Sequence, residues 1–348
     1  MKAVKMHAIK DLRVEDVPKP SPGPDEVLLK IHAVGVCGSD IPRANKKAPH
    51  VLPLILGHEF AGEVVELGSG VTKLTVGDRV AAAPLIPDPN DPWSKQGLFS
   101  LSEGYKYYGS RNDGAFAEFL AVKEANCVNL ADNVPYDWGA TVDPAANALH
   151  ACWRAELCAC DTMAVFGVGG IGQFSMQYAK GLGVETIIAV DIDDEKLAIA
   201  EKSGATHIIN AANKDPVQEI LKITDNQGVT VVLEMAGAPA TQLQSIMAAK
   251  KRGRVVFLGI SNAPLDLPAS AVDKILRHEV CVMGSWNSFS APFPGAEWTE
   301  SARLMAEGKL NPEILITHRL GLDDIPQTFA KVDSEPFSFI KLMFYPQG

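Results

Sequence analysis

Two short motifs in the N-terminal part of the chain carry side chains of the kinds that bind metal ions. The first motif contains Cys37, and the second contains His58 followed directly by Glu59. Zinc takes sulfur, nitrogen and oxygen ligands in a tetrahedron, and a catalytic zinc site keeps one position for water or substrate. Asp143 is a further candidate oxygen ligand. The sequence therefore predicts a divalent-metal site built from these four residues.

Neighbours of these ligands are predicted to act together with the metal. Asp40 is expected to accept the free N–H of His58 and so to fix its tautomer, as carboxylates behind metal-bound histidines do. Ser39 is expected to pass the proton of an alcohol outward. The predicted catalytic residues are therefore Ser39, Asp40 and Glu59. A lone cysteine or a lone histidine would more often be a core or surface residue, but the two motifs occur together.

A glycine run further along the chain has the pattern of a dinucleotide-binding turn. Gly167-Val-Gly-Gly-Ile-Gly172 follows an apolar stretch and precedes a helical pattern. Such a run allows a tight turn, close approach of the backbone to a pyrophosphate, and close packing of helix on strand. The helix that follows offers free N–H groups to the phosphates. The predicted coenzyme contacts are Gly167, Gly169, Gly170, Ile171, Gly172, Asp191 and Lys196.

Asp191 ends the next apolar stretch after the glycine run. A carboxylate in this place is expected to accept hydrogen bonds from the ribose hydroxyls and to repel a 2′-phosphate. Further acidic residues follow it at 193–195. These features favour NAD over NADP. The alternative is a glycine-rich turn that binds nothing. Together, the two motif groups predict that a metal activates an alcohol while a nicotinamide ring takes its hydride.

Length and composition limit the classes of protein that fit. The chain has 348 residues, which is longer than one hydrophobic core usually supports, so two domains are expected. The formal net charge of -10 argues against a nucleic-acid partner. No segment approaches the roughly 18 apolar residues of a membrane span, and the first residues lack the apolar core of a signal peptide. Of the six cysteines, Cys158 and Cys160 could form a redox or metal pair, but one intervening residue is poor geometry for a chelate, so both are predicted to be buried or semi-buried thiols. The expected protein is a reduced, cytoplasmic enzyme.

The pattern of the chain changes near residue 145. Before about residue 125, short strands alternate with Gly- and Pro-rich turns, which favours a barrel-like all-β unit. After residue 145, strands and helices alternate, which indicates a parallel sheet covered on both faces. The predicted fold is therefore α/β, with a β-barrel domain and a doubly wound parallel-sheet domain. The strands expected in the second part are 163–166, 186–190, 207–210, 229–234, 254–258 and 280–283, with helices at 146–157, after the glycine run to about 181, and at 194–203.

Several motifs together resemble the zinc-dependent medium-chain alcohol/polyol dehydrogenase family. The motifs are Cys37-Gly-Ser-Asp40, Gly57-His-Glu-Phe-Ala-Gly62, Gly77-Asp-Arg-Val80, Asp113-Gly-Ala-Phe-Ala-Glu118 and the glycine run Gly167–Gly172. The resemblance covers the whole chain. It implies a GroES-like catalytic domain made of residues 1–147 and 287–348, and a Rossmann NAD-binding domain at 148–286. It also implies homodimers or homotetramers formed through the coenzyme domains.

The resemblance assigns roles to individual positions and reveals two departures. Cys37 and His58 match zinc ligands of the family, and Glu59 matches an acid that lies beside the metal. Asp143 stands where this branch of the family usually has the longer Glu. The family's structural zinc is held by four cysteines, whereas the matching positions here are Asp88, Asp91, Ser94 and Ser102. Because such a zinc cage needs thiolates or imidazoles, one catalytic zinc per chain is expected and a structural zinc is not.

The substrate is expected to be a sugar alcohol or its phosphate. The stretches 284–287 and 294–298 resemble the branch of the family that acts on galactitol 1-phosphate, so oxidation of its secondary hydroxyl to a ketose phosphate is expected. Free polyols of the sorbitol or galactitol type and L-threonine remain alternatives. A zinc-free quinone reductase and a non-catalytic homologue are more remote ones. The candidate substrate contacts are Arg43, Arg111, Lys274, Trp286 and Asn287.

Overall fold

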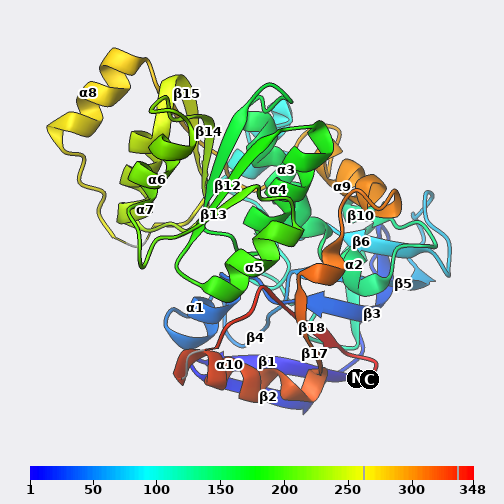
Figure 1. Ribbon diagram of the computed structural model, residues 1–348. Coiled ribbons are helices and arrows are strands. Elements are labelled where there is room, and N and C mark those ends of the chain that lie inside the picture. The colour runs from blue at the N-terminus through cyan, green and yellow to red at the C-terminus, as the bar shows by residue number, and fades with distance from the viewer. Residues whose placement is uncertain (262, 335–336) are drawn as a thin grey trace. The chain divides into compact units, whose positions relative to one another are not determined.

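The computed structural model describes residues 1–261, 263–334 and 337–348 (Figure 1). The chain forms two compact units: the first comprises Met1–Ala146, Ser288–Gly308 and Ile316–Gly348, and the second comprises Asn147–Asn287 and Lys309–Leu315. The segment Lys309–Leu315 was expected in the first unit. It lies with the second because Asn311 and Gln177 exchange two hydrogen bonds, with N···O distances of 2.6 and 3.2 Å.

The first unit is built mainly from antiparallel strands. A seven-stranded sheet has the order β10-β6-β5-β3-β18-β17, with β9 also paired to β3; a second sheet has the order β2-β1-β4, and β7 pairs with β8. Its strands are β1 (Lys2–Ala8), β2 (Asp11–Asp16), β3 (Glu26–Gly35), β4 (Leu54–Ile55), β5 (Glu59–Leu67), β6 (Arg79–Ala82), β7 (Leu85–Ile86), β8 (Lys106–Tyr107), β9 (Phe119–Lys123), β10 (Cys127–Asn129), β17 (Ile316–Gly321) and β18 (Lys341–Tyr345). The C-terminal β18 pairs with β3, so both ends of the chain contribute to one sheet.

Helices of the first unit are short. They are α1 (Asp40–Asn45), α2 (Tyr136–Ala140), α9 (Ala296–Ala306) and α10 (Ile325–Ser334). One apolar core joins β1, β3, β5 and β18 to α10 and includes Val4, Leu29, Phe60, Phe116 and Phe344. Phe116 meets Phe344 edge to face, with ring centroids 6.0 Å apart. This core fixes the central strands that carry the candidate metal ligands.

The second unit contains a six-stranded parallel sheet with the order β13-β12-β11-β14-β15-β16. The strands are β11 (Thr162–Phe166), β12 (Thr186–Asp191), β13 (His207–Asn210), β14 (Val229–Glu234), β15 (Ala249–Phe257) and β16 (Cys281–Gly284). The helices are α3 (Val142–Arg154), whose first turns belong to the first unit, α4 (Gly170–Leu182), α5 (Asp194–Lys202), α6 (Pro216–Ile223), α7 (Pro239–Ala248) and α8 (Ala269–His278). This order places β11 and β14 at the centre, where the chain changes direction across the sheet. The arrangement is that of a doubly wound dinucleotide-binding domain.

Alternate residues of the parallel strands pack into two separate hydrophobic cores, one on each face of the sheet. On one face, Met163 and Val165 of β11 pack with Met176 of α4 and Leu197 of α5. On the other face, neighbouring strand residues pack with helices α6 and α7. Successive strand side chains point to opposite faces, so continuous apolar runs are needed where both faces are covered. The predicted fold class, a β-rich GroES-like domain with a Rossmann-like parallel sheet, is confirmed.

The prediction for Cys158 and Cys160 is wrong. Both residues are exposed, and they are joined in a disulfide rather than held as buried thiols. Their Cα atoms are 5.4 Å apart, which lies within the normal range for a disulfide. One intervening residue is poor geometry for a chelate, but it does not prevent a covalent bond between the two sulfurs. The expectation that all cysteines are reduced is therefore also wrong.

None of the helices in the described part of the chain combines the length and the apolar character that crossing a membrane requires.

Candidate functional site

The two predicted metal-binding motifs meet because β3 and β5 pair as antiparallel neighbours. In this register Gly35, at the end of β3, faces Glu59, at the start of β5. Cys37 lies two residues beyond Gly35, and His58 lies one residue before Glu59. A Cβ atom on Gly35 would lie 2.6 Å from Oε2 of Glu59, so only glycine leaves room for this carboxylate. The pairing of β3 with β5 therefore brings the side chains of Cys37, His58 and Glu59 close together.

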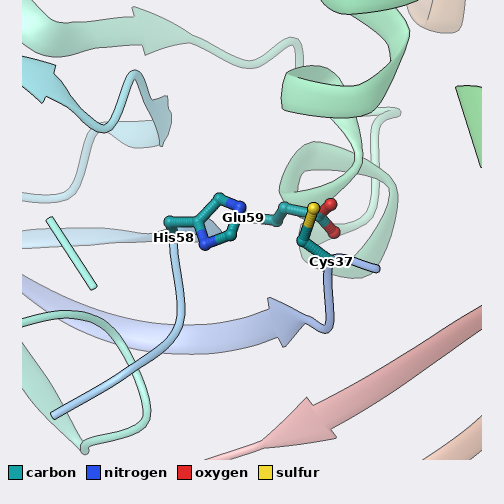
Figure 2. A group of neighbouring side chains, drawn as sticks. All are labelled: Cys37, His58 and Glu59. Atoms are coloured by element: carbon teal, nitrogen blue, oxygen red, sulfur yellow. The ribbon is translucent and has the colours of Figure 1, made fainter. Parts of the chain in front are cut away.

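Cys37, His58 and Glu59 form a compact group of potential ligands. One sulfur, one ring nitrogen and one carboxylate oxygen all lie within 4.8 Å of one another. Figure 2 shows the three side chains as a group of neighbours. His58 and Glu59 are buried, and Cys37 is half-buried. These donors fit zinc, which binds sulfur, nitrogen and oxygen, and they leave coordination positions for another ligand.

Asp40 organises the two motifs from behind. Its Oδ2 accepts a hydrogen bond from the backbone N–H of Cys37 at 3.0 Å, and its Oδ1 lies 3.3 Å from Nδ1 of His58. Nη1 of Arg43 donates to the same Oδ1 at 3.1 Å. The Asp40 side chain is completely buried. It therefore occupies the place expected of the carboxylate that orients His58.

The charges around this group reinforce one another. Burial alone would raise the pKa of Asp40, but His58, Arg43 and the Cys37 N–H together lower it below its ordinary value. Burial alone would lower the pKa of His58, but Asp40 and Cys37 raise it well above its ordinary value. Negative charge is thus concentrated at the site, which favours a bound cation. In the absence of metal, this charge favours the protonated form of His58.

Glu59 has a partner that the sequence did not suggest. Nζ of Lys341, on β18, lies 2.5 Å from Oε2 of Glu59 and donates to the carbonyl of Val36 at 3.0 Å. Both side chains are buried. Burial works against the charge of Lys341, but Glu59, followed by Cys37 and Asp143, raises its pKa above the ordinary value. The only sequence signal was a single lysine within the apolar stretch 339–344.

Asp143 and Tyr107 complete the surroundings of the ligand group. Asp143 lies outside the group of three but is buried. Burial raises its pKa to about 7; the charge of Glu59 adds to this shift, and His58 opposes it. Tyr107, also missed from the sequence, meets the His58 ring edge to face at a centroid distance of 5.7 Å. Burial, followed by the charges of Asp143 and Cys37, raises the pKa of Tyr107 well above its ordinary value.

The other predicted residues of the first unit are Ser39, Arg43 and Arg111. Ser39 is half-buried and precedes α1, directly before Asp40. Arg43 reaches the group through Asp40. Arg111 contacts Tyr105: its guanidinium stacks on the ring at 4.4 Å from the centroid and donates to the Tyr105 carbonyl.

Three predicted substrate residues belong to the second unit. Lys274 donates to the carbonyl of Met247 at 2.9 Å, and burial lowers its pKa. Trp286 is about half exposed, and Asn287 has a left-handed backbone with φ of 55°. Of the predicted substrate residues, the structure connects Arg43 to the candidate ligands through Asp40, and a role of the other residues in substrate binding stays a prediction.

The glycine run has the geometry that a dinucleotide turn requires. Gly167 has φ of 89°, which favours glycine, and a Cβ there would lie 2.7 Å from the backbone nitrogen of Ala236. A Cβ on Gly172 would lie 2.5 Å from the Gly167 carbonyl oxygen, so α4 can pack closely only with glycine. A Cβ on Gly169 would meet nothing within 4 Å. Gly169 precedes the first residue of α4, Gly170, so the open space lies at a helix N-terminus, where phosphates bind.

Asp191 has a structural role that the sequence did not predict. Its Oδ2 accepts from the N–H of Val168 in the glycine turn at 2.8 Å. Its Oδ1 accepts from the N–H groups of Ile192 and Asp193 at 2.8 and 3.1 Å. A carboxylate has about four acceptor positions, so room for one further donor remains. Asp191 thus braces the turn and can still meet a ribose hydroxyl.

Other predicted contacts near the turn have local partners. The backbone N–H of Lys196 donates to Asp193, the cap of α5, and its Nζ lies 3.9 Å from Oδ2 of Asp193. Ile171 accepts a hydrogen bond at its carbonyl from Ser175. Buried Gln173 donates to the carbonyls of Val168 and Lys196, which ties the turn to α5.

The lobe that lacks the family's four cysteines is held together by its own hydrogen bonds. Oδ1 of Asp91 accepts from the N–H groups of Trp93 and Ser94, and Oδ2 accepts from that of Glu103 at 3.3 Å. Oδ1 of Asp88 accepts from the N–H of Asn90 at 2.9 Å. A carboxylate can therefore replace metal as the centre of such a loop. The lack of a structural zinc stays a prediction.

A second cluster of potential ligands lies in the second unit. Cys158, Cys160 and Asp161 also bring their ligand atoms within 4.8 Å of one another. Because the two sulfurs are joined in a disulfide, they are not thiolates and do not form a metal site in this state.

A β-rich unit with a zinc-type ligand group and a parallel sheet with a dinucleotide turn together define a two-domain dehydrogenase. Comparison with known proteins agrees. Residues 23–132 match the alcohol dehydrogenase GroES-like domain family, and residues 170–307 match the zinc-binding dehydrogenase family. The chain belongs to the zinc-dependent medium-chain alcohol/polyol dehydrogenase family, and it is an oxidoreductase.

Individual relatives cover nearly the whole chain. Galactitol 1-phosphate 5-dehydrogenase of Escherichia coli K12 is 38% identical over 88% of this chain and 89% of its own length. A crystal structure of the Escherichia coli enzyme superposes with a TM-score of 0.94, at 36% identity, covering 99% of this chain and all of that one. Sorbitol dehydrogenase of Bacillus subtilis is 31% identical over 99% of this chain and 97% of its own length. A zinc-binding dehydrogenase of Sinorhizobium meliloti, solved with NADP, superposes with a TM-score of 0.92, at 31% identity, covering 99% of both chains.

Proposed function

We propose that this protein oxidises a secondary hydroxyl of a sugar alcohol or of a sugar-alcohol phosphate, with hydride transfer to NAD. The substrate that we favour is galactitol 1-phosphate, which would give a ketose phosphate. The observation that carries the proposal is the group of Cys37, His58 and Glu59, whose ligand atoms lie within 4.8 Å of one another. The similarity to galactitol 1-phosphate 5-dehydrogenase, at 38% identity, supports the choice of substrate.

Cys37, His58 and Glu59 would hold the catalytic zinc, and buried Asp143 is the further candidate. Bound zinc would supply a Lewis acid that lowers the pKa of a hydroxyl group, and NAD would supply the hydride acceptor. Asp40 orients the His58 ring through its Oδ1, 3.3 Å from Nδ1. Half-buried Ser39 lies next to Asp40 in the chain and would carry the alcohol proton outward.

Lys341 adds a positioning role that the family motifs alone did not suggest. Its ammonium group holds one oxygen of Glu59 at 2.5 Å and leaves the other oxygen of that carboxylate for a cation. A lysine in this place also offsets part of the negative charge of Cys37, Glu59 and Asp143. The site would therefore hold zinc without collecting excess charge.

The preference for NAD rests on the acidic surroundings of the glycine turn. Asp191 keeps one acceptor position, and two further carboxylates follow it at the start of α5: Asp193, the N-cap, and Asp194, the first helical residue. These carboxylates would repel the additional phosphate of NADP. The relative solved with NADP shows that the same fold also takes the phosphorylated coenzyme.

Arg43 supports a phosphorylated substrate. Its guanidinium lies beside the ligand group through its hydrogen bond to Asp40, and its side chain keeps 23% of its surface exposed. A cation so placed suits a phosphate group at one end of a polyol. Free polyols form the second candidate class, which the likeness to sorbitol dehydrogenase favours.

The remaining expectations are part of the same proposal. One zinc per chain, a homodimer or homotetramer, and a cytoplasmic location would each agree with the proposed enzyme. Exposed apolar side chains on α8 and on the edge strand β16, including Leu276 and Val282, support assembly through the second unit.

A panel of alcohols and coenzymes tests the proposal. The panel contains galactitol 1-phosphate, galactitol, sorbitol and L-threonine, each with NAD and with NADP. The expected result is the highest kcat/KM with galactitol 1-phosphate and NAD, and a loss of the preference for NAD in the Asp191→Ala variant. Equal kcat/KM for phosphorylated and free galactitol would contradict the choice of substrate. Turnover of quinones and of no alcohol would overturn the proposed reaction.

A further inference from the structure

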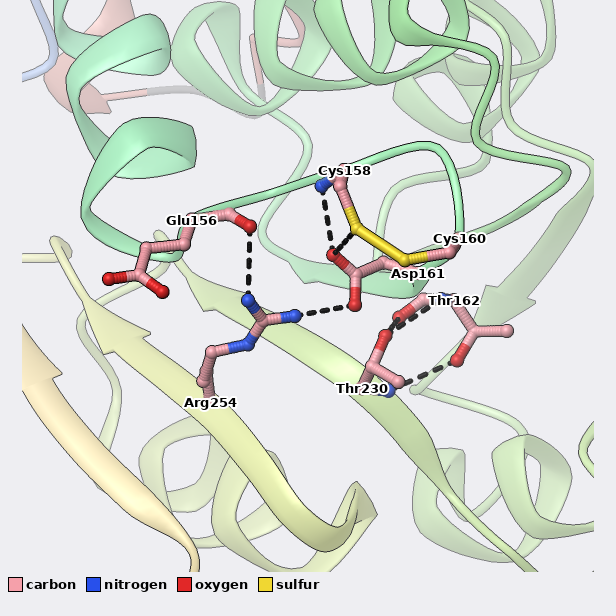
Figure 3. The surroundings of a disulfide bond; sticks show 7 residues. All are labelled: Glu156, Cys158, Cys160, Asp161, Thr162, Thr230 and Arg254. Carbon is pink, nitrogen blue, oxygen red and sulfur yellow. Dashed lines mark hydrogen bonds and ion pairs between the residues drawn. A yellow bond between two sulfur atoms is a disulfide. The ribbon is translucent and has the colours of Figure 1, made fainter.

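A disulfide lies in the loop between α3 and β11, the strand that leads into the glycine turn. It joins Cys158 to Cys160, and both residues are exposed to solvent (Figure 3). The described part of the chain keeps its four other cysteines free: Cys37, Cys127, Cys152 and Cys281.

This bond is poorly suited to stabilising the fold. A disulfide stabilises a protein mainly by restricting the unfolded chain, and the effect grows with the length of the loop that it closes. Cys158 and Cys160 are only two positions apart, so the closed loop is as short as a C-x-C pair allows. Exposed disulfides are also the ones that thiols reduce readily, in contrast to buried structural ones. The position thus favours a bond that is made and broken.

Asp161 is placed so that it distinguishes the two redox states. Its Oδ2 accepts a hydrogen bond from the backbone N–H of Cys158 at 2.9 Å and lies 3.3 Å from the Cys158 sulfur. In the disulfide this sulfur carries no proton, so the short contact brings no hydrogen bond. In the reduced state an S–H group at the same place would donate to the carboxylate. Asp161 therefore stabilises the dithiol relative to the disulfide.

The surroundings keep Asp161 in place in either state. Nη2 of Arg254, on β15, lies 2.5 Å from Oδ1 of Asp161, and Nη1 donates to the carbonyl of Glu156 at 3.0 Å. Thr162 and Thr230 exchange three hydrogen bonds of 2.7 to 3.0 Å, which anchor the first residue of β11 to β14. Figure 3 shows these contacts on both sides of the disulfide. Opening the bond would therefore change the loop and leave the parallel sheet intact.

We propose that Cys158 and Cys160 form a reversible thiol–disulfide exchange site that takes a dithiol as its redox partner. One thiolate of the partner attacks a sulfur of the pair, so that a mixed disulfide forms and the Cys158–Cys160 bond breaks. The second thiol of the partner then closes the partner's own disulfide and releases the remaining cysteine. Two electrons pass from the dithiol to the pair, and its two thiol protons end on Cys158 and Cys160. The site is independent of the proposed dehydrogenase reaction.

A redox titration of the full-length protein tests this proposal. Protein purified without reductant is equilibrated with mixtures of reduced and oxidised dithiothreitol, quenched with acid, alkylated after denaturation, and analysed by peptide mass spectrometry. We expect Cys158 and Cys160 to gain alkylation together, in proportion to the ratio of reduced to oxidised dithiothreitol and independently of protein concentration. The melting temperature should stay the same across the titration. A parallel series with glutathione, a monothiol, should react more slowly at equal thiol concentration.

Three variants serve as controls. Cys281→Ser should leave the titration unchanged, whereas Cys158→Ser should abolish it and leave Cys160 alkylated throughout. The Asp161→Asn variant should need a ratio of reduced to oxidised dithiothreitol at least about threefold higher for half-reduction, because the charged hydrogen-bond acceptor of the dithiol is lost. A change in this ratio is a readout that a merely structural role of Asp161 would not produce.

Two results would overturn the proposal. In the first, both cysteines remain fully alkylated after equilibration with oxidised dithiothreitol, so no disulfide forms. In the second, the bond survives excess reduced dithiothreitol in the folded protein, or its reduction unfolds the chain, so it acts as a structural crosslink.

Discussion

Replacement of Lys341 by methionine is the perturbation whose effect follows most directly from the structure. Methionine has a similar length and volume but no charge, so the packing of β18 is largely kept. The ammonium group of Lys341 neutralises buried Glu59 at 2.5 Å and also donates to the Val36 carbonyl. Its removal leaves the Glu59 carboxylate buried beside Cys37 and Asp143 without its paired ammonium group. We expect the metal-free protein to lose stability.

The size of the effect can be bounded. Removing one partner of a buried ion pair costs about 3–5 kcal/mol of unfolding free energy, because the other charge stays buried and uncompensated. For a unit of this size, that loss corresponds to a fall in melting temperature of roughly 6–20 °C. Bound zinc should offset part of the loss, since a cation beside Glu59 replaces the missing charge. Added zinc should therefore raise the melting temperature of Lys341→Met by more than it raises that of the wild type.

Differential scanning calorimetry of metal-free and zinc-loaded protein measures both effects. The double variant Glu59→Gln with Lys341→Met is the matched control, because it removes both charges together. The double variant should be more stable than Lys341→Met alone in the metal-free state. The reasoning is refuted if metal-free Lys341→Met melts with the wild type, or if the double variant is less stable than the single one.

Two further predictions concern the second unit. In the glycine turn, Gly172→Ala should lower the melting temperature, since its Cβ would lie 2.5 Å from the Gly167 carbonyl oxygen. Gly169→Ala should keep the melting temperature and weaken NAD binding measured by calorimetry, because a Cβ there meets nothing within 4 Å. Equal melting temperatures of the two variants would contradict the packing role of Gly172. Burial raises the pKa of Cys152 to about 12, so roughly one thiol in ten thousand is ionised at pH 8, and this residue should resist iodoacetamide until the protein is denatured or the pH approaches 12. Rapid labelling of Cys152 in native protein at pH 8, followed by peptide mass spectrometry, would show that this prediction is wrong.

Much of the fold could be predicted from local patterns. The strand 229–234 was predicted with the bounds that β14 has, because an unbroken apolar run is what a strand covered on both faces requires. The helix expected at 146–157 is observed as α3, Val142–Arg154, so it begins and ends earlier than predicted. Its start depends on the preceding short helix α2, which carried no clear periodicity.

The candidate metal site was only partly accessible to sequence reasoning. Two short motifs were enough to suggest Cys37, His58 and Glu59 as a group, because each motif brings its own ligand types. Lys341 is 282 residues from Glu59 along the chain, and only the pairing of β18 with β3 brings them together. Tyr107 reaches His58 from β8, a strand of only two residues that no sequence pattern marks. Contacts of this kind depend on the tertiary fold.

The disulfide and the bracing role of Asp191 were missed for a different reason. Cys158 and Cys160 were predicted to be buried thiols because their spacing is poor geometry for a chelate, although the same spacing can close a disulfide. Asp191 was judged by the ribose that it would meet, although its carboxylate first accepts three backbone N–H groups. A carboxylate can serve both purposes, so its role in coenzyme choice stays a prediction.

The zinc content of the purified protein, measured together with its activity, tests the central claim most directly. Zinc would be quantified by mass spectrometry before chelation, after chelation, and after zinc is added back, with turnover of galactitol 1-phosphate and NAD measured on each sample. We predict one zinc per chain at the start, loss of turnover in step with loss of zinc, and recovery on addition of zinc; Cys37→Ala should neither hold the metal nor turn over. Full turnover by protein stripped of zinc, or by a zinc-free Cys37→Ala variant, would contradict the account.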